Sequence, residues 1–227
     1  MVHRVPGESP RRSARSAGAR PGHSRAAMDY SSLDEARADA ANCRDCPLWR
    51  NATQTVFGEG HESATIVLVG EQPGDQEDRV GKPFVGPAGR LLDRALEEAG
   101  IDRNATYVTN AVKHFKFELR GKRRIHKKPN ELEISACRQW LERELALIEP
   151  GLIVAMGTTA ARAVFGRATA IGKNRGRVIA AQEAATGCEA DILVTVHPSY
   201  LLRVPDEERA AAYERFVEDL KLARQYV

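Results

Sequence analysis

"ATIVLVGEQPG", residues 64–74, decides the fold because a short apolar run leads directly into a turn that contains two glycines. The β-branched and aliphatic residues of the run predict a buried strand over Ala64–Gly70. Glycine permits a tight turn and a close approach of the backbone to a ligand. The turn lacks the G-x-G-x-x-G spacing of dinucleotide sites, so it is either an ordinary strand-to-helix connection or part of a different site.

Apolar runs of the same kind recur along the chain and alternate with helical patterns. Strands that alternate with helices predict an α/β fold, a three-layer sandwich in which a central, mostly parallel sheet is flanked by helices. Ligands of such sheets bind beyond the carboxyl ends of the strands, where "GEQPG", "NAVKH" and "HPSYLLR" fall. The further predicted strands are 105–110, 151–157 and 191–196; the predicted helices are 33–43, 86–100, 130–150, a small-residue helix after 157, and 207–224.

The composition is typical of a soluble protein. The chain has 227 residues, 42% of them apolar, which suffices for one domain with a sizeable core, with or without a tail. No apolar run reaches the length of a membrane-spanning helix, and no signal peptide with an apolar centre is visible. We therefore expect a cytoplasmic monomer that contacts no membrane.

The charge is distributed unevenly. Residues 1–27 hold six Arg and one acid, a charge of +5, so the remaining chain carries 3 − 5 = −2. Because this stretch has almost no large apolar residue, it predicts a disordered basic tail ahead of a folded domain over residues 28–227. Met28 is an alternative start of the protein, and a DNA-binding arm is an alternative role for the tail.

A basic cluster lies near the middle of the chain. Between Lys113 and Lys128 there are eight Lys or Arg and one acid, Glu118. Such a cluster indicates contact with the phosphates of a nucleic acid. It contains "GKRRIHKKP", residues 121–129, in which His126 is either one more phosphate contact or, because imidazole loses its charge near neutral pH, a nucleophile.

The four cysteines indicate metal binding or redox chemistry rather than a disulfide framework. "CRDC", residues 43–46, is a C-x-x-C motif that presents two thiolates to one metal. Two ligands do not complete a four-coordinate site. Cys137 and Cys188 are the other thiols, and His114 is a further candidate ligand.

Several motifs follow one another in order: "CRDC", "GEQPG" followed by "GKPFVGPAGRLL", "TNAVKHF", "KRRIHKKP", "AC" at 136–137, and "HPSYLLR". Over roughly residues 43–224 the chain resembles the iron–sulfur uracil-DNA glycosylases, a superfamily that includes the family 4 enzymes. It resembles most closely the UdgX type, which excises uracil and then stays covalently attached to the abasic DNA. "KRRIH" is the motif that separates this type from its ordinary relatives.

The resemblance implies a [4Fe–4S] cluster. Ordinary iron–sulfur glycosylases have Cys in the motif written here as "VKHF", where UdgX proteins have His. The implied ligands are therefore Cys43, Cys46, His114 and Cys137, and Cys188 becomes a spare thiol in a variable loop. We expect the cluster to be structural, tying the basic loop and the N-terminal segment to the sheet.

The resemblance also implies a pocket for a flipped uracil base. An aromatic face stacks on any base, so Phe84 supplies affinity while hydrogen bonds supply selectivity. The Asn110 amide both donates and accepts, which suits O4 and N3–H of uracil. Gln72 closes the rest of the pocket together with nearby backbone, and Asp75 belongs to the same motif.

The "HPSYLLR" motif implies the group that helps uracil to leave. By the family pattern His197 lies beside uracil O2 and stabilises the charge of the departing uracil anion. Arg203 contacts phosphate or braces the basic loop. Ser199 and Tyr200 shape the turn that faces DNA.

His126 is the nucleophile that the resemblance to the UdgX type implies. Breaking the N-glycosidic bond leaves C1′ open to attack, by water in an ordinary glycosylase and by a neutral imidazole here. Glu71 is the implied acceptor for the other ring nitrogen, as the acid is in a Ser-His-Asp triad. The flanking cations are expected to grip phosphates: Lys122, Arg123, Arg124, Lys127 and Lys128.

The expected partners are uracil-containing DNA, with single strands favoured, and abasic DNA. Two alternative functions remain open. One is an ordinary multiple-turnover uracil-DNA glycosylase in which water is activated near Glu71. The other is a non-catalytic nucleic-acid-binding module with a structural zinc at the Cys and His residues.

Overall fold

The computed structural model describes residues 30–227, so the predicted tail over 1–27 and the alternative start at Met28 lie outside the described residues. A six-stranded sheet forms the centre, in the order β1-β3-β2-β6-β8-β7. The four inner strands are parallel, and each edge strand is antiparallel to its neighbour. The strands are β1 (Glu59–Gly60), β2 (Ile66–Gly70), β3 (Thr106–Asn110), β6 (Leu152–Met156), β7 (Val178–Ile179) and β8 (Asp191–Thr195).

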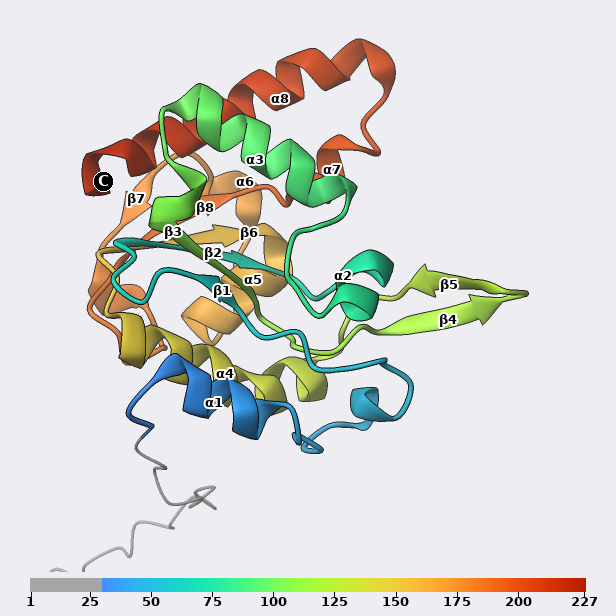
Figure 1. The fold of residues 1–227 in the computed structure, drawn as a ribbon. Coiled ribbons are helices and arrows are strands. Elements are labelled where there is room, and N and C mark those ends of the chain that lie inside the picture. Colours follow the sequence, from blue (N-terminus) through green and yellow to red (C-terminus); the bar gives the residue numbers. More distant parts are fainter. Residues whose placement is uncertain (1–29) are drawn as a thin grey trace, which may run out of the picture.

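Helices cover both faces of the sheet, as Figure 1 shows, and each face has its own hydrophobic core. The predicted three-layer α/β sandwich is therefore confirmed. One face is covered by α1 (Leu33–Ala40), α4 (Glu131–Ile148) and α5 (Gly157–Phe165), and the other by α3 (Pro87–Ala99) and α8 (Asp206–Lys221).

The inner strands are buried along most of their length because both faces of the sheet are covered. All five residues of β2, β3 and β6 are buried. The helix boundaries follow local chemistry. The Asn130 side chain caps the start of α4 in a capping box with Glu133, and α3 stops at Gly100, which has a φ of +73°.

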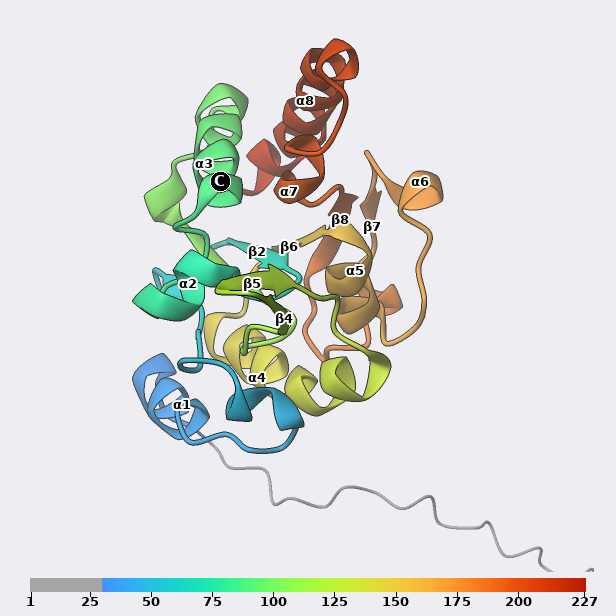
Figure 2. The same cartoon turned by 90° about the vertical axis from the view of Figure 1, so that its right-hand side faces the viewer.

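The basic segment forms a β-hairpin, where the sequence analysis expected a loop. Its strands are β4 (Phe117–Arg120) and β5 (Arg123–His126), joined at Gly121, which has a φ of +60°. The hairpin projects beyond the sheet in Figure 1 and points toward the viewer in Figure 2. β4 alternates between apolar and polar residues over only four positions, and β5 has a single apolar residue, Ile125, so the pattern is too short to mark a hairpin in a sequence.

Several short elements were not predicted, because each has six residues or fewer and too short a pattern to show a period. They are α2 (Asp75–Val80), α6 (Ile171–Asn174), α7 (Pro198–Leu201) and the 3₁₀ turns η1 (Pro47–Arg50), η2 (Arg103–Ala105), η3 (Ala181–Glu183) and η4 (Leu222–Tyr226), together with β1 and β7. Across residues 30–227, none of the helices combines the length and the apolar character that crossing a membrane requires.

Candidate functional site

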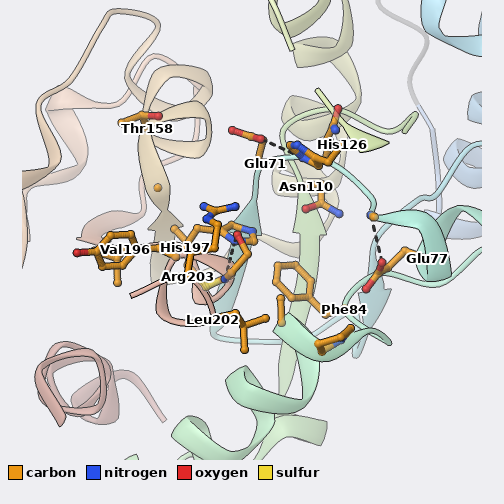
Figure 3. A pocket seen from close by; sticks show the side chains of 18 of the residues that line it. Glu71, Glu77, Phe84, Asn110, His126, Thr158, Val196, His197, Leu202 and Arg203 are labelled. Atoms are coloured by element: carbon orange, nitrogen blue, oxygen red, sulfur yellow. Dashed lines mark hydrogen bonds and ion pairs between the residues drawn. The ribbon is translucent and has the colours of Figure 1, made fainter. Parts of the chain in front are cut away.

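A large cavity lies beyond the carboxyl ends of the parallel strands. It has a volume of about 630 Å³ and opens between the turn after β2, the end of β3, the hairpin and α7. Figure 3 shows the side chains that line it. Eight of the residues expected at the site lie there: Glu71, Gln72, Asp75, Phe84, Asn110, His126, His197 and Arg203, joined by Ser199 and Tyr200 from α7.

Phe84 and Asn110 line the cavity, and both lie close to Gly70 at the end of β2. The Phe84 ring centroid lies 5.9 Å from that of His197, with 28° between the ring planes. A Cβ at Gly70 would lie 2.6 Å from Phe84 Cζ, so glycine is needed for the ring to approach the strand end. Phe84 has a φ of +56°, which is unusual for a bulky residue and shows that the surroundings hold it in place.

His197 lines the cavity, and one of its ring nitrogens lacks a hydrogen-bond partner among the described residues. The Ser199 backbone N–H donates to its Nδ1 over 3.1 Å, and the Ser199 hydroxyl lies 2.9 Å from the same atom. Because Nδ1 accepts, the proton of a neutral ring sits on Nε2, which is buried and has no hydrogen-bond partner in the described part of the chain. Burial lowers the pKa of His197 to about 4. The site therefore holds a neutral donor, His197 Nε2–H, that has no acceptor among the described residues.

His126 and Glu71 face each other at the mouth of the cavity. His126 Nε2 lies 3.3 Å from Glu71 Oε1, and the imidazole side chain is 46% exposed. The other carboxylate oxygen of Glu71 accepts a hydrogen bond from the hydroxyl of Thr159. Burial acts to raise the pKa of Glu71, but the hydrogen bonds from His126 and Thr159 bring it below its usual value. The pair thus consists of an accessible imidazole and an ionised acceptor.

Gln72 lines the cavity as expected, and its side chain also makes hydrogen bonds to the hairpin. Its Nε2 donates to the carbonyls of Lys116 and Lys127, both over 3.1 Å, and its Oε1 accepts from Lys116 N over 3.2 Å. The amide therefore joins the two chain segments at the base of the hairpin. Gln72 lines the cavity, but its polar atoms hold the hairpin rather than point freely at a base.

Asp75 and Arg124 form an ion pair with each other, which bears on the phosphate contact expected of Arg124. The Arg124 side chain is only 13% exposed, and besides Asp75 it donates to Asp78 over 2.6 Å. Its guanidinium also lies over the rings of Phe115 and Phe117, at 5.4 and 5.1 Å from their centroids. Arg124 therefore anchors the hairpin to α2 instead of standing ready for a phosphate.

The other cations of the basic cluster differ in their surroundings. Lys122 and Arg123 are exposed at the hairpin tip and form no ion pair with any described residue. Lys127 pairs with Glu118 over 2.9 Å, and Lys128 donates to Thr158 over 3.1 Å. Lys113, counted in the cluster from the sequence, is fully buried and cannot contact DNA.

A second, smaller cavity brings together Cys43, Cys46, His114 and Cys137. Trp140 Nε1 donates to Cys43 Sγ over 3.2 Å, and Lys113 N donates to Cys137 Sγ over 3.1 Å. Cys188 does not line this cavity.

The orientation of His114 is set by Thr55. The Thr55 hydroxyl gives its proton to the Ala40 carbonyl over 2.9 Å, so His114 Nε2, which lies 2.9 Å from the same hydroxyl oxygen, is the donor of that contact. Nδ1 then keeps its lone pair. Metal-binding histidines are commonly fixed in this way by a partner on the other nitrogen.

Comparison with known proteins gives the family of the chain. Residues 57–221 match the model of the uracil DNA glycosylase superfamily. The chain belongs to this superfamily. It is 38% identical over 187 residues to the type-4 uracil-DNA glycosylase of Thermotoga maritima, covering 82% of this chain and 89% of the relative. The type-4 uracil-DNA glycosylase of Pyrobaculum aerophilum is 34% identical, and the match covers 78% of this chain and 87% of the relative. The type-4 enzyme of Archaeoglobus fulgidus is 33% identical, and the match covers 82% of this chain and 92% of the relative.

The residues of this glycosylase-superfamily member fit an iron–sulfur cluster. Across residues 30–227, no three Cys, His, Asp or Glu side chains form a ready-made group for a single metal ion. A [4Fe–4S] cluster takes one protein ligand for each iron, so its ligands stand farther apart. Burial raises the pKa of the Cys137 thiol to about 12 and also raises that of Cys46. A bound metal favours the thiolate form of such thiols, and N–H donors lie within hydrogen-bond distance of Cys43 Sγ and Cys137 Sγ.

Two polar residues near these sites were missed in the sequence. Thr159 follows β6 in "GTTAAR", and Thr55 precedes β1 in "TQTVFGEG". The position of Thr159 just after a predicted strand was an available signal, since that is where ligand-binding groups of a parallel sheet gather. Thr55 had no such signal, because its contact with His114 joins residues 59 positions apart.

Proposed function

We propose that the protein excises uracil from DNA and then becomes covalently linked, through His126, to C1′ of the abasic site. Membership of the superfamily and the similarity to type-4 uracil-DNA glycosylases support the excision. The observation that carries the covalent step is the contact of 3.3 Å between His126 and Glu71 at the mouth of the cavity.

Uracil would be recognised in the cavity by Phe84 and Asn110. The base stacks on the Phe84 ring, which contributes about 1–3 kcal/mol in comparable aromatic sites. The Asn110 side chain is buried at the end of β3 and pairs with O4 and N3–H. Cytosine presents the opposite donor and acceptor at these positions and would leave buried polar groups unpaired.

His197 would stabilise the leaving group. As the bond between C1′ and N1 breaks, its electron pair moves into the uracil ring and charge develops on O2. His197 lines the cavity, and its neutral Nε2–H, which has no partner among residues 30–227, would donate to that oxygen without moving a proton. The deoxyribose is left with oxocarbenium character at C1′.

His126 would then attack C1′ with its lone-pair nitrogen. Contact with Glu71 favours a proton on the ring nitrogen that faces the carboxylate, so the opposite nitrogen is free. As the bond from nitrogen to C1′ forms, the ring proton shifts toward Glu71, which keeps the charges balanced. The product is a stable histidine adduct, and each protein molecule acts once.

Phosphate contacts would come from the exposed groups around the cavity. Lys122 and Arg123 at the hairpin tip have no acidic partner among residues 30–227, and neither does Arg203 at the cavity rim. Lys127 and Ser199 are secondary candidates because each already has a protein partner. We propose single-stranded uracil-containing DNA as the favoured substrate.

Cys43, Cys46, His114 and Cys137 would hold a [4Fe–4S] cluster. When bound, the cluster supplies four bonds that tie the segment before η1 to α4 and to the chain leading into the hairpin. If these residues hold the cluster, purified protein will contain iron and acid-labile sulfide. Zinc without iron would instead favour a structural zinc site.

The test of the function uses a labelled single-stranded oligonucleotide with one uracil, analysed on a denaturing gel after heating. The wild-type protein is expected to give a slow, heat-stable band that requires uracil, and His126→Ser is expected to lose it. If the wild type gives only an alkali-cleavable product, the protein is an ordinary turnover glycosylase like the type-4 relatives it resembles. If it gives neither product, it is a binding module.

A further inference from the structure

The two oxygens of the Glu71 carboxylate have different partners. Oε1 faces His126 Nε2 at 3.3 Å, whereas Oε2 accepts the hydroxyl proton of Thr159. A carboxylate that is held at one oxygen cannot rotate freely about its last bond. The Thr159 contact therefore decides where the second oxygen points.

Thr159 is placed for this contact by the sheet. β6 lies beside β2, and α5 begins at Gly157 directly after β6, so the first turn of α5 lies next to the turn that carries Glu71. Thr159 is only 1% exposed. A hydroxyl that is buried in this way, with one acceptor, holds a fixed direction.

We propose that Thr159 is a positioning residue that holds Glu71 in the orientation needed to receive the proton of His126. The inference rests on the proposed covalent function. Thr159 contacts neither the base nor C1′ in this account, and it acts only through Glu71.

The chemistry requires both the direction and the ionised form of Glu71. The carboxylate must be charged when the ring proton moves, and it must present an oxygen to the nitrogen that bears that proton. Three side chains from different elements face it: His126 from β5, Thr159 from α5, and His197 after β8. His197 is neutral over the working range, so the hydroxyl of Thr159 and the imidazole of His126 are the groups that favour the charged form.

The experiment compares Thr159→Val, which keeps the shape but removes the hydroxyl, with Thr159→Ser, which keeps the hydroxyl. Thr106→Val is the matched control, because Thr106 is equally buried and donates to the Arg103 carbonyl over 2.8 Å at the opposite end of the sheet from the site. The rates of adduct formation and of free uracil release are each measured against pH with the uracil oligonucleotide. Thermal unfolding of each variant checks that it is folded.

Thr159→Val is expected to slow adduct formation by about tenfold or more, the effect of one lost hydrogen bond to a charged group. The fall in its rate at low pH, which we call the acid limb of the pH–rate profile, should move to higher pH. The reason is that the Glu71 carboxylate is protonated more easily without the hydrogen bond from Thr159. Thr159→Ser should restore both properties, and Thr106→Val should change neither. A Thr159→Val protein with the wild-type rate and an unmoved acid limb would overturn the proposal.

Failure of the covalent function would be recognised separately. If the wild type releases uracil but forms no adduct, the proposed covalent step is wrong. The acid limb of the pH–rate profile of uracil release then reports the protonation of the Glu71 carboxylate. A shift of that limb in Thr159→Val, reversed in Thr159→Ser, would still support the positioning role. An unmoved limb would reject it.

Discussion

At the scale of single residues, the surroundings of each titratable group at the site set its charge. The ring of His197 is buried without a charged partner in contact, so its pKa falls and the ring stays neutral. Glu71 is also buried, but two donors offset the cost, so its carboxylate stays charged. One cavity therefore holds a neutral donor on one side and an ionised acceptor on the other.

Replacing His197 by Ala should slow uracil release by about 10²–10³-fold, the usual effect of removing one donor to a developing oxyanion. The rate is measured in single turnover with excess protein, so that binding does not limit it. Ser199→Ala is the companion variant. It removes the hydroxyl near Nδ1 but keeps the backbone N–H that fixes the tautomer, so it should retain most of the rate. Equal losses in both variants would contradict the role of Nε2.

The stability of the protein should also depend on His197. Its pKa is about 4 in the folded protein and has a reference value of 6.5. Folding favours the neutral form of the His197 ring. The contribution of this ring to the free energy of unfolding is therefore fully present above pH about 6.5 and is lost as the pH falls toward about 4. Urea unfolding across this range should show a shallower decline for His197→Gln than for the wild type. Identical declines would show that the imidazole is not held neutral.

The sequence could place some site residues but not others, and the difference is physical. Glu71, Asn110 and His197 each lie at or just beyond the end of an apolar strand, and the rules for parallel sheets bring such positions together. The hydrogen-bond partners of Gln72 and Arg124 could not be predicted from the sequence. Their partners are backbone and acidic groups about 45 to 55 positions away, which no local pattern reveals.

At the scale of elements, the hairpin is the unit that carries His126. It packs little apolar surface, so polar contacts hold it: Gln72 joins its base, and Arg124 ties it to α2. Phe115 and Phe117 lie beneath the Arg124 guanidinium. The position of His126 over the cavity depends on these few contacts.

Replacing Gln72 by Met should loosen the hairpin. The substitution keeps the size of the side chain but removes its three hydrogen bonds to the backbone of Lys116 and Lys127, where the hairpin begins and ends. Hydrogen exchange of residues 116–127 should quicken by about tenfold or more, since each net hydrogen bond contributes about 1 kcal/mol. Gln54→Met is the matched control, because the Gln54 amide donates to two backbone carbonyls, those of Asp78 and Arg79 on α2. Unchanged exchange in Gln72→Met would mean that the hairpin is held by other contacts.

At the scale of the whole molecule, a buried polar network links β3, α4 and the region of the metal-ligand candidates. Lys113 pairs with Glu144 over 2.6 Å, and both side chains are almost fully buried. Glu144 also accepts from Tyr107, Thr109 and the backbone N–H of Gly58. Lys113 in turn donates to the carbonyl of Asn110 over 2.9 Å, so the network braces the strand end that would read the base.

Lys113→Met should destabilise the protein by about 3–5 kcal/mol, because it leaves the Glu144 carboxylate buried without its counter-charge. Denaturant unfolding measures the change. The double variant Lys113→Met with Glu144→Gln should recover much of the loss, since a neutral amide oxygen can still accept from Tyr107 and Thr109. A double variant no more stable than the single one would show that charge compensation is not the reason for the pair.

The layered fold could be predicted from the sequence, whereas the charge of its surface could not. Alternating apolar strands and amphipathic helices leave few arrangements for a chain of this length. Lys113 illustrates the other case. It belongs to a run of basic residues in the sequence, yet its side chain is buried and forms an ion pair with Glu144.

The most direct test of the central claim is to find the atom of the protein that bears the DNA. The wild-type adduct with the uracil oligonucleotide is digested with nuclease and protease, and the modified peptide is sequenced by mass spectrometry. We expect the deoxyribose remnant on His126, without any reducing agent to trap it. A remnant on Lys122 or Lys127 that survives only after borohydride treatment would instead show a Schiff base with the abasic aldehyde and would contradict the proposed attack by His126.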